Sequence, residues 1–89
     1  MKEFEKEYII SELKKQIINN FPSIKIINEY EKNGTTIIEI YTPDKNHKAI
    51  NDMSSKLSSE ILINYGLDVL FLIYDNPEVL DWYVELENN

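Results

Sequence analysis

The 89-residue sequence contains no cysteine and no arginine, and it has one histidine and two glycines. The lack of cysteine excludes disulfide bonds, thiolate zinc sites and cysteine nucleophiles. The lack of arginine removes the side chain that clamps phosphate or carboxylate groups with two parallel hydrogen bonds. Two glycines are too few for a phosphate-binding loop. We therefore expect no catalytic residues, no cofactor and no metal in this protein.

Long apolar stretches are also missing. The longest strongly apolar run, residues 69–73, is much shorter than the roughly 20 residues that span a bilayer. The chain opens with charged residues and has no apolar signal-peptide core behind Met1. Together with the lack of cysteine, this predicts one cytoplasmic domain, residues 1–89, that does not enter a membrane.

Charge is divided unevenly along the chain. The net charge is −7, yet residues 1–56 hold nine lysines and nine acids. Residues 57–89 hold no lysine and seven acids: Glu60, Asp68, Asp75, Glu78, Asp81, Glu85 and Glu87. A field of this sign repels phosphate backbones and attracts basic partners. We expect no direct nucleic-acid binding, and the alternative explanation of the acids is that they only maintain solubility.

The first half of the sequence predicts a helix followed by a β-hairpin. Apolar residues repeat at helical spacing through residues 3–20, at Phe4, Tyr8, Ile10, Leu13, Ile17 and Phe21. Residues 24–32 and 35–42 favour strands, and Asn33 and Gly34 between them form the strongest short hairpin signal. A two-residue loop pairs Tyr30 with Ile37, Asn28 with Glu39 and Ile26 with Tyr41 on one face, and Ile27 with Ile40 and Glu29 with Ile38 on the other. Both faces then need cover.

The second half predicts a helix and a third strand. Asp44 is a suitable N-cap for a helix over residues 45–65, and Gly66 suits its C-terminal end. This helix should bury Ile50, Met53, Leu57 and Ile61. Residues 67–74 are almost all apolar, which indicates a strand buried on both faces. A strand–helix–strand connection makes this strand parallel to residues 35–42.

Two structures compete for the C-terminal residues. Asn76 and Pro77 favour a short helix, with a cap followed by proline at the first position. The alternation of Trp82, Val84 and Leu86 with polar neighbours favours an edge strand instead. We favour the helix. The predicted fold is α+β: a single-domain two-layer sandwich in the order αββαβ(α), with a three-stranded mixed sheet.

His47, the single histidine, falls in the first turn of the second predicted helix. The residue types of a catalytic triad are present, with His47, Asp44 and one of Ser54, Ser55 or Ser58. Residues on one straight helix cannot converge around a substrate carbonyl as nucleophile, base and orienting group. We therefore interpret His47 as a solvated residue at the start of a helix.

Residues 36–41, the helix that follows them and residues 65–69 resemble the later core of minimal nucleotidyltransferase domains. In that family a strand, a helix and a second strand contribute metal-binding carboxylates, whose places Glu39 and Asp68 would take. The family's Gly-Ser phosphate motif is missing here, and residues 39–41 stand where paired aspartates belong. The resemblance implies at most a homologue that has lost its activity.

These observations favour a non-enzymatic acidic domain that binds a protein with a basic surface, in the manner of inhibitors, immunity proteins and antitoxins. Aromatic and acidic residues gather near the C-terminus, and such residues are typical of binding surfaces. We predict partner contacts by Tyr74, Asp75, Glu78, Asp81, Trp82, Tyr83 and Glu85. The alternatives are a homodimeric assembly subunit of a bacterial or phage complex, and C-terminal residues that merely close the core.

Overall fold

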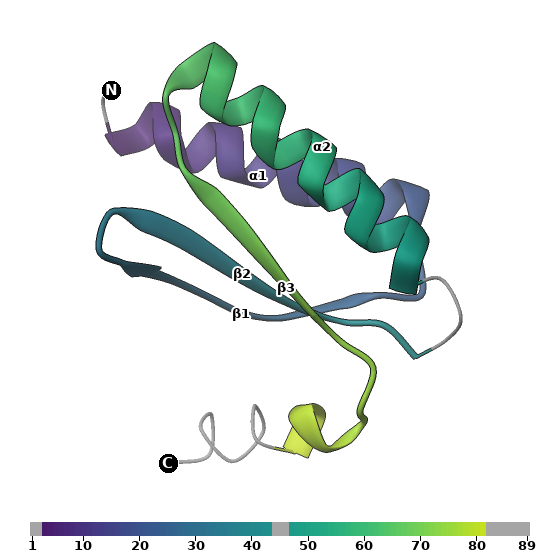
Figure 1. Cartoon of the computed structure of the whole chain (residues 1–89). Coiled ribbons are helices and arrows are strands. Elements are labelled where there is room, and N and C mark those ends of the chain that lie inside the picture. Colours follow the sequence, from purple (N-terminus) through teal and green to yellow (C-terminus); the bar gives the residue numbers. More distant parts are fainter. Residues whose placement is uncertain (1–2, 44–46, 82–89) are drawn as a thin grey trace.

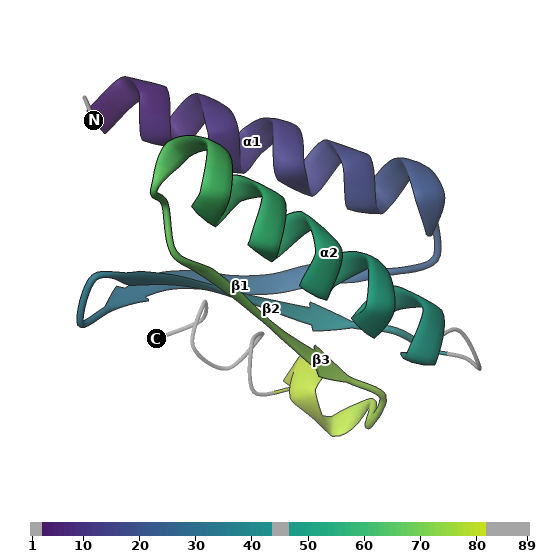
Figure 2. The ribbon, with the colours of Figure 1, turned by 45° about the horizontal axis from the view of Figure 1, so that its top comes forward.

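The computed structural model describes residues 3–43 and 47–81. Helix α1 spans Glu3–Asn20, and it is followed by β1 (Lys25–Lys32), β2 (Thr35–Tyr41), α2 (His47–Tyr65) and β3 (Val69–Tyr74). Both long helices lie on one face of the sheet, and a further helical turn, residues 78–81, lies on the other (Figures 1 and 2). The predicted α+β class and element order are confirmed. The predicted N-cap Asp44 falls outside the described residues.

The sheet has the order β1-β2-β3, with β1 and β2 antiparallel and β2 and β3 parallel. This is the predicted mixed topology. Asn33 and Gly34 take backbone φ angles of 55° and 84° in the hairpin loop. Both angles lie in the left-handed region that a two-residue hairpin turn requires and that glycine adopts without strain.

The register of the hairpin differs from the prediction beyond Asn28. Asn28 pairs with Glu39 as expected, but Ile26 pairs with Ile40, so Ile27 is the extra residue of a β-bulge. The predicted pairs of Ile26 with Tyr41 and Ile27 with Ile40 were wrong. The bulge lets Ile24 and Ile26 both pack with the helices, while Ile27 turns to the opposite face. Packing of these isoleucines explains the irregularity.

The main core lies between the helices and the sheet. Ile38, Ile40 and Ile50 are fully buried, and Ile10, Leu13 and Ile17 of α1 pack with them. Tyr8, expected in the same stripe, is 66% exposed. It precedes Ile10 by two residues, or roughly 200° around the helix, so it points away from the sheet.

Burial of α2 is less complete than the sequence predicted. Ile50 is buried, but Met53, Leu57 and Ile61 are only half-buried. Leu57 and Ile61 line an open groove between the two helices, which leaves part of each side chain accessible. Ser54, a small residue on the inner face, is 97% buried instead (3% exposed).

Strand β3 is buried on one face only, so the prediction of burial on both faces was wrong. Val69 and Phe71 face the helices and are 4% and 8% exposed. Leu70, on the opposite face, is 47% exposed. Apolar composition alone does not show which face of a strand a second layer covers.

A smaller apolar cluster lies on the face of the sheet away from α1 and α2. Ile27, Tyr41 and Val79 are buried there, with Tyr74 and Leu80 packed against them. Val79 therefore attaches the turn that begins at Glu78 to the sheet. None of the described helices is long and apolar enough to cross a membrane.

Candidate protein-binding surfaces

The predicted partner-binding residues that the structure describes lie at the C-terminal end of β3. Tyr74 ends the strand and is half-buried, whereas Asp75, Glu78 and Asp81 are exposed. The turn starts as predicted, because the Glu78 N–H donates a hydrogen bond to Asn76 Oδ1 at 3.0 Å. The expected contacts Trp82, Tyr83 and Glu85 fall outside the described residues. We call Asp75, Glu78 and Asp81 the C-terminal acidic surface.

Tyr74 is held within the sheet. Its hydroxyl donates a hydrogen bond to Glu39 Oε2 at 2.6 Å, and Asn28 Nδ2 donates to Glu39 Oε1 at 3.0 Å. The hydrogen bond to Glu39, together with burial, raises the pKa of Tyr74 to about 12. The hydroxyl therefore fixes the end of β3, while the ring packs against the apolar cluster of Ile27, Tyr41 and Val79 and leaves only part of its surface for a partner.

Lysines neutralise acids in the first part of the chain but not in the last third. Lys6 pairs with Glu31, Lys14 with Glu29, Lys15 with Glu12, and Lys48 with Asp52. Within the described residues 57–81, no acid takes part in an ion pair. The segregation of charge seen in the sequence therefore persists among the described residues, where no lysine pairs with the C-terminal acidic surface.

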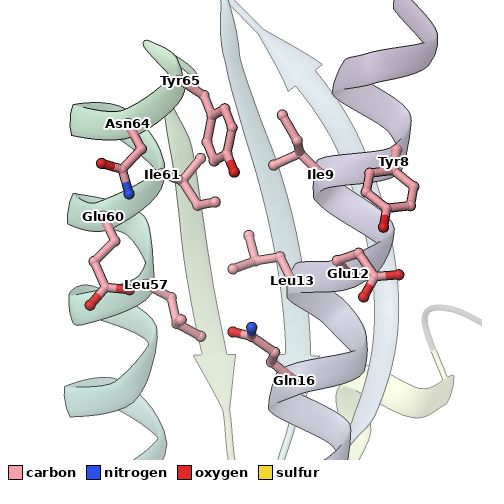
Figure 3. Close-up of a pocket in the computed structure, with 10 residues that line it drawn as sticks. All are labelled: Tyr8, Ile9, Glu12, Leu13, Gln16, Leu57, Glu60, Ile61, Asn64 and Tyr65. Carbon is pink, nitrogen blue, oxygen red and sulfur yellow. The ribbon is translucent and has the colours of Figure 1, made fainter.

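A groove of about 260 Å³ separates α1 and α2 on the outer side of the helical layer. Figure 3 shows Ile9, Leu13 and Ile61 between the helices, with Tyr8 and Tyr65 at one end of the groove. Tyr8 and Tyr65 are 66% and 53% exposed. Acidic and amide side chains complete the lining, and no lysine contributes: Glu12, Gln16, Glu60 and Asn64.

Sequence reasoning missed this groove because it assigned Tyr8 to the core. The only signal in the sequence was the helical phase of Tyr8, which places it opposite Ile10. Aromatic rings near carboxylates can bind a lysine or arginine side chain by cation–π and charge interactions. Glu12 pairs with Lys15, so Glu60 is the acid of this groove without an ion pair among the described residues, and the groove is a second but less charged candidate surface.

The residues considered for chemistry that the structure describes do not assemble into a site, and Asp44 falls outside the described residues. His47 Nε2 lies 3.4 Å from Asn51 Nδ2, one turn further along α2. Asp68 accepts a hydrogen bond from Thr35 Oγ1 at 2.7 Å, while Glu39 is in register with Leu72. Four strand positions separate Asp68 from Leu72, or roughly 13 Å, too far for two carboxylates on one metal ion.

No metal cluster is present among the described residues, because no group of three or more His, Asp or Glu side chains converges there. The chain matches no protein-family model, and comparison with curated proteins and with solved structures finds no significant similarity. Function is therefore inferred from the surfaces of this chain alone.

Proposed function

We propose that this chain is a non-catalytic binding domain that engages a basic surface of another protein and thereby blocks it, as inhibitors, immunity proteins and antitoxins do. The observation that carries the proposal is that Asp75, Glu78 and Asp81 form no ion pair with any residue that the structure describes. These three acids are exposed, and the four ion pairs of the described residues all lie between residues 6 and 52. We further propose that the protein acts in the cytoplasm.

The fixed backbone of two of these acids, Glu78 and Asp81, supports a role in recognition. Val79 is 3% exposed and packs against Ile27 and Tyr41, so the turn that bears Glu78 and Asp81 is attached to the sheet. A surface that is ordered before binding loses less conformational entropy when the partner docks. Negative charge on it speeds encounter with a basic partner and opposes binding to nucleic acid.

Charge reversal on this surface tests the proposal. Glu78→Lys combined with Asp81→Lys should slow association with the partner by roughly tenfold or more. Glu5→Lys combined with Glu7→Lys is the matched control, because both side chains are exposed on α1 and the net charge changes equally. A partner captured from the native host and identified by mass spectrometry is then purified for stopped-flow measurements across a salt series.

We expect the wild-type and control proteins to bind with an association rate that falls as salt rises, because charges more than about 8 Å apart are screened at physiological salt. The C-terminal variant should bind slowly at every salt concentration. Equal association rates for the two variants would show that the C-terminal acids only solvate the surface. Circular dichroism spectra should be unchanged in both.

A homodimeric assembly subunit is the second candidate, and one feature of the sheet favours it. Tyr30, Ile37 and Leu70 are in register across the three strands and share the face away from α1 and α2. Tyr30 and Leu70 are 39% and 47% exposed, while Ile37 between them is 7% exposed. Light scattering distinguishes the candidates: a dimer that persists at high salt supports the second, and a monomer supports the first.

A further inference from the structure

Strand β3 lies at an edge of the sheet and pairs with one neighbour only. Within residues 3–43 and 47–81, β2 is its sole hydrogen-bonded partner. Its six residues, Val69–Tyr74, include no charged residue, no proline and no glycine. A free, apolar strand edge is a template on which another strand can form main-chain hydrogen bonds.

The backbone direction of β3 follows from two hydrogen bonds with β2. Thr36 N donates to Asp68 O at 2.9 Å, and Thr42 N donates to Tyr74 O at 2.8 Å. Even-numbered residues therefore direct their N–H and C=O groups toward β2. Because these groups alternate along a strand, Val69, Phe71 and Ile73 direct theirs to the free edge. Three donors and three acceptors face outward there for an added strand.

The opposite edge of the same sheet is protected. Strand β1 contains the bulge at Ile27 and four charged residues, Lys25, Glu29, Glu31 and Lys32. Bulges and charged side chains are the devices by which edge strands avoid pairing with other chains. Strand β3 has an unbroken register and neither device. The contrast between the two edges indicates that the β3 edge is kept open for binding.

A groove of about 240 Å³ lies beside this edge. It is lined by Val69, Leu70 and Phe71 and by small polar residues of α2, among them Ser54, Ser55 and Ser58. Ser54 is 97% buried (3% exposed), yet its hydroxyl has no hydrogen-bond partner among the described residues. A buried hydroxyl without a partner is costly unless a ligand or water satisfies it. The Ser54 hydroxyl is itself buried beneath the groove, so the side chains that the groove presents to a ligand are those of Ser55, which is exposed, and Ser58, which is half-buried.

The charges at the ends of β3 indicate what kind of strand would bind. Asp68 precedes the strand and Asp75 follows it, and both side chains are exposed. A second copy of β3 would bring two more acids to this edge, and the chain already has a net charge of −7. Lysine or arginine at the two ends of an incoming segment would instead pair with Asp68 and Asp75.

We propose that the β3 edge binds an extended segment of a partner protein, which adds a fourth strand to the sheet. The segment is about eight residues long, the length of residues 68–75, with basic residues at both ends and apolar residues at alternate positions. One of its side chains enters the groove and lies beside Ser55 and Ser58. The basic ends rest on the proposed function, whereas the strand pairing follows from the edge itself.

The test is selection of a phage-displayed library of random eight-residue peptides against the full chain. Leu70→Lys places a charge on the binding edge, as protected edge strands do. Two controls isolate its effect. Leu62→Lys makes the same change at equal exposure on α2, with Leu62 at 50% and Leu70 at 47%. Tyr30→Lys changes the same face of the sheet on the far strand, β1.

We expect enriched peptides with alternating apolar residues and basic ends. Their affinity should fall roughly tenfold or more for Leu70→Lys and change less than about twofold for both controls. Amide hydrogen exchange of Val69, Phe71 and Ile73 should slow in the complex. Ser55→Ala should weaken only those peptides that carry a hydrogen-bonding side chain for the groove.

Three results would overturn the proposal. One is a failure to enrich any peptide more strongly on the wild type than on Leu70→Lys. Another is enriched peptides that leave the three edge amides unprotected or that lose binding equally with Tyr30→Lys. The third is a wild-type dimer that Leu70→Lys dissociates, which makes a second copy the occupant. Enriched peptides without basic ends would instead refute the basic partner of the proposed function and leave the strand pairing standing.

Discussion

Two isoleucines of α2 provide a matched test of the fold, because they share a helix and a side chain and differ in burial. Ile50 is fully buried against the sheet, whereas Ile63 is 82% exposed. Truncating each to alanine removes the same atoms. The difference between the two free energies of unfolding therefore reports the packing of α2 on the sheet.

For Ile50→Ala, the expected loss of stability is about 2–5 kcal/mol, the range for isoleucine in a packed core. For Ile63→Ala, about 18% of a side chain remains buried, and full burial of isoleucine contributes about 1.5–3 kcal/mol. The loss should thus be near 0.3–0.5 kcal/mol. The higher helix propensity of alanine offsets most of it, so the net change should be close to zero.

Urea unfolding followed by circular dichroism measures both variants. A domain of this length has a total stability of about 4–13 kcal/mol, so Ile50→Ala retains a folded state only if the wild type lies well inside this range. Ile50→Val, expected to cost about 0.5–1.5 kcal/mol, keeps the measurement accessible if the alanine variant does not fold. The dependence of the unfolding free energy on urea should not change.

Equal losses for Ile50→Ala and Ile63→Ala would refute this description of α2. If the loss for Ile63→Ala also grew with protein concentration, Ile63 would be buried between copies of the chain, and the homodimeric candidate would replace the monomeric binding domain.

Two further predictions concern the sheet. The pKa of Tyr74 is raised from 10.0 to about 12, because the folded protein holds the proton more tightly. The stability that this provides is present below pH 10 and is lost as the pH rises toward 12. Urea unfolding at alkaline pH should show this loss for the wild type and not for Tyr74→Phe, and the same pH dependence in both proteins would contradict the Tyr74–Glu39 hydrogen bond. Gly34 has a φ of +84°, and no atom lies within 4 Å of the position that an alanine methyl group would take. Gly34→Ala should therefore lower the stability by about 1–2 kcal/mol through backbone strain alone. A thermal melt that shows no loss of stability would mean that the hairpin turn differs from the one described.

Much of the fold could be predicted because local signals agreed with the final packing. The turn at Asn33 and Gly34, the cap at Asn76 and the glycine after α2 each have a local physical cause, and each was found. The errors came from choices that only tertiary packing makes. Whether Ile26 or Ile27 faces the helices depends on where α1 lies. The β-bulge at Ile27 turns Ile26 toward the helices and Ile27 toward the opposite face. No periodicity within residues 24–32 contains that information.

The candidate surfaces could be predicted in part for the same reason. Their charge was visible in the sequence, because seven acids follow the last lysine. Their shape was not. The groove between α1 and α2 depends on the separation of two helices that are far apart in the sequence. The helical phase explains the exposure of Tyr8, but only the packing of the two helices brings Tyr8 and Tyr65 to one groove.

The wrong expectation about β3 bears directly on function. The apolar run of residues 67–74 predicts a strand buried on both faces, since continuous apolar runs are typical of such strands. In the structure, the helices cover the face of β3 that carries Val69 and Phe71, whereas Leu70 on the other face is 47% exposed. The outer edge of β3 has no hydrogen-bonded partner strand among the described residues. Selection for solubility alone would place charged residues on such an edge, as β1 has. Strand β3 instead keeps an apolar composition on its open edge, with Asp68 before it and Asp75 after it. We expect this pattern in a sheet that receives an additional strand from another protein.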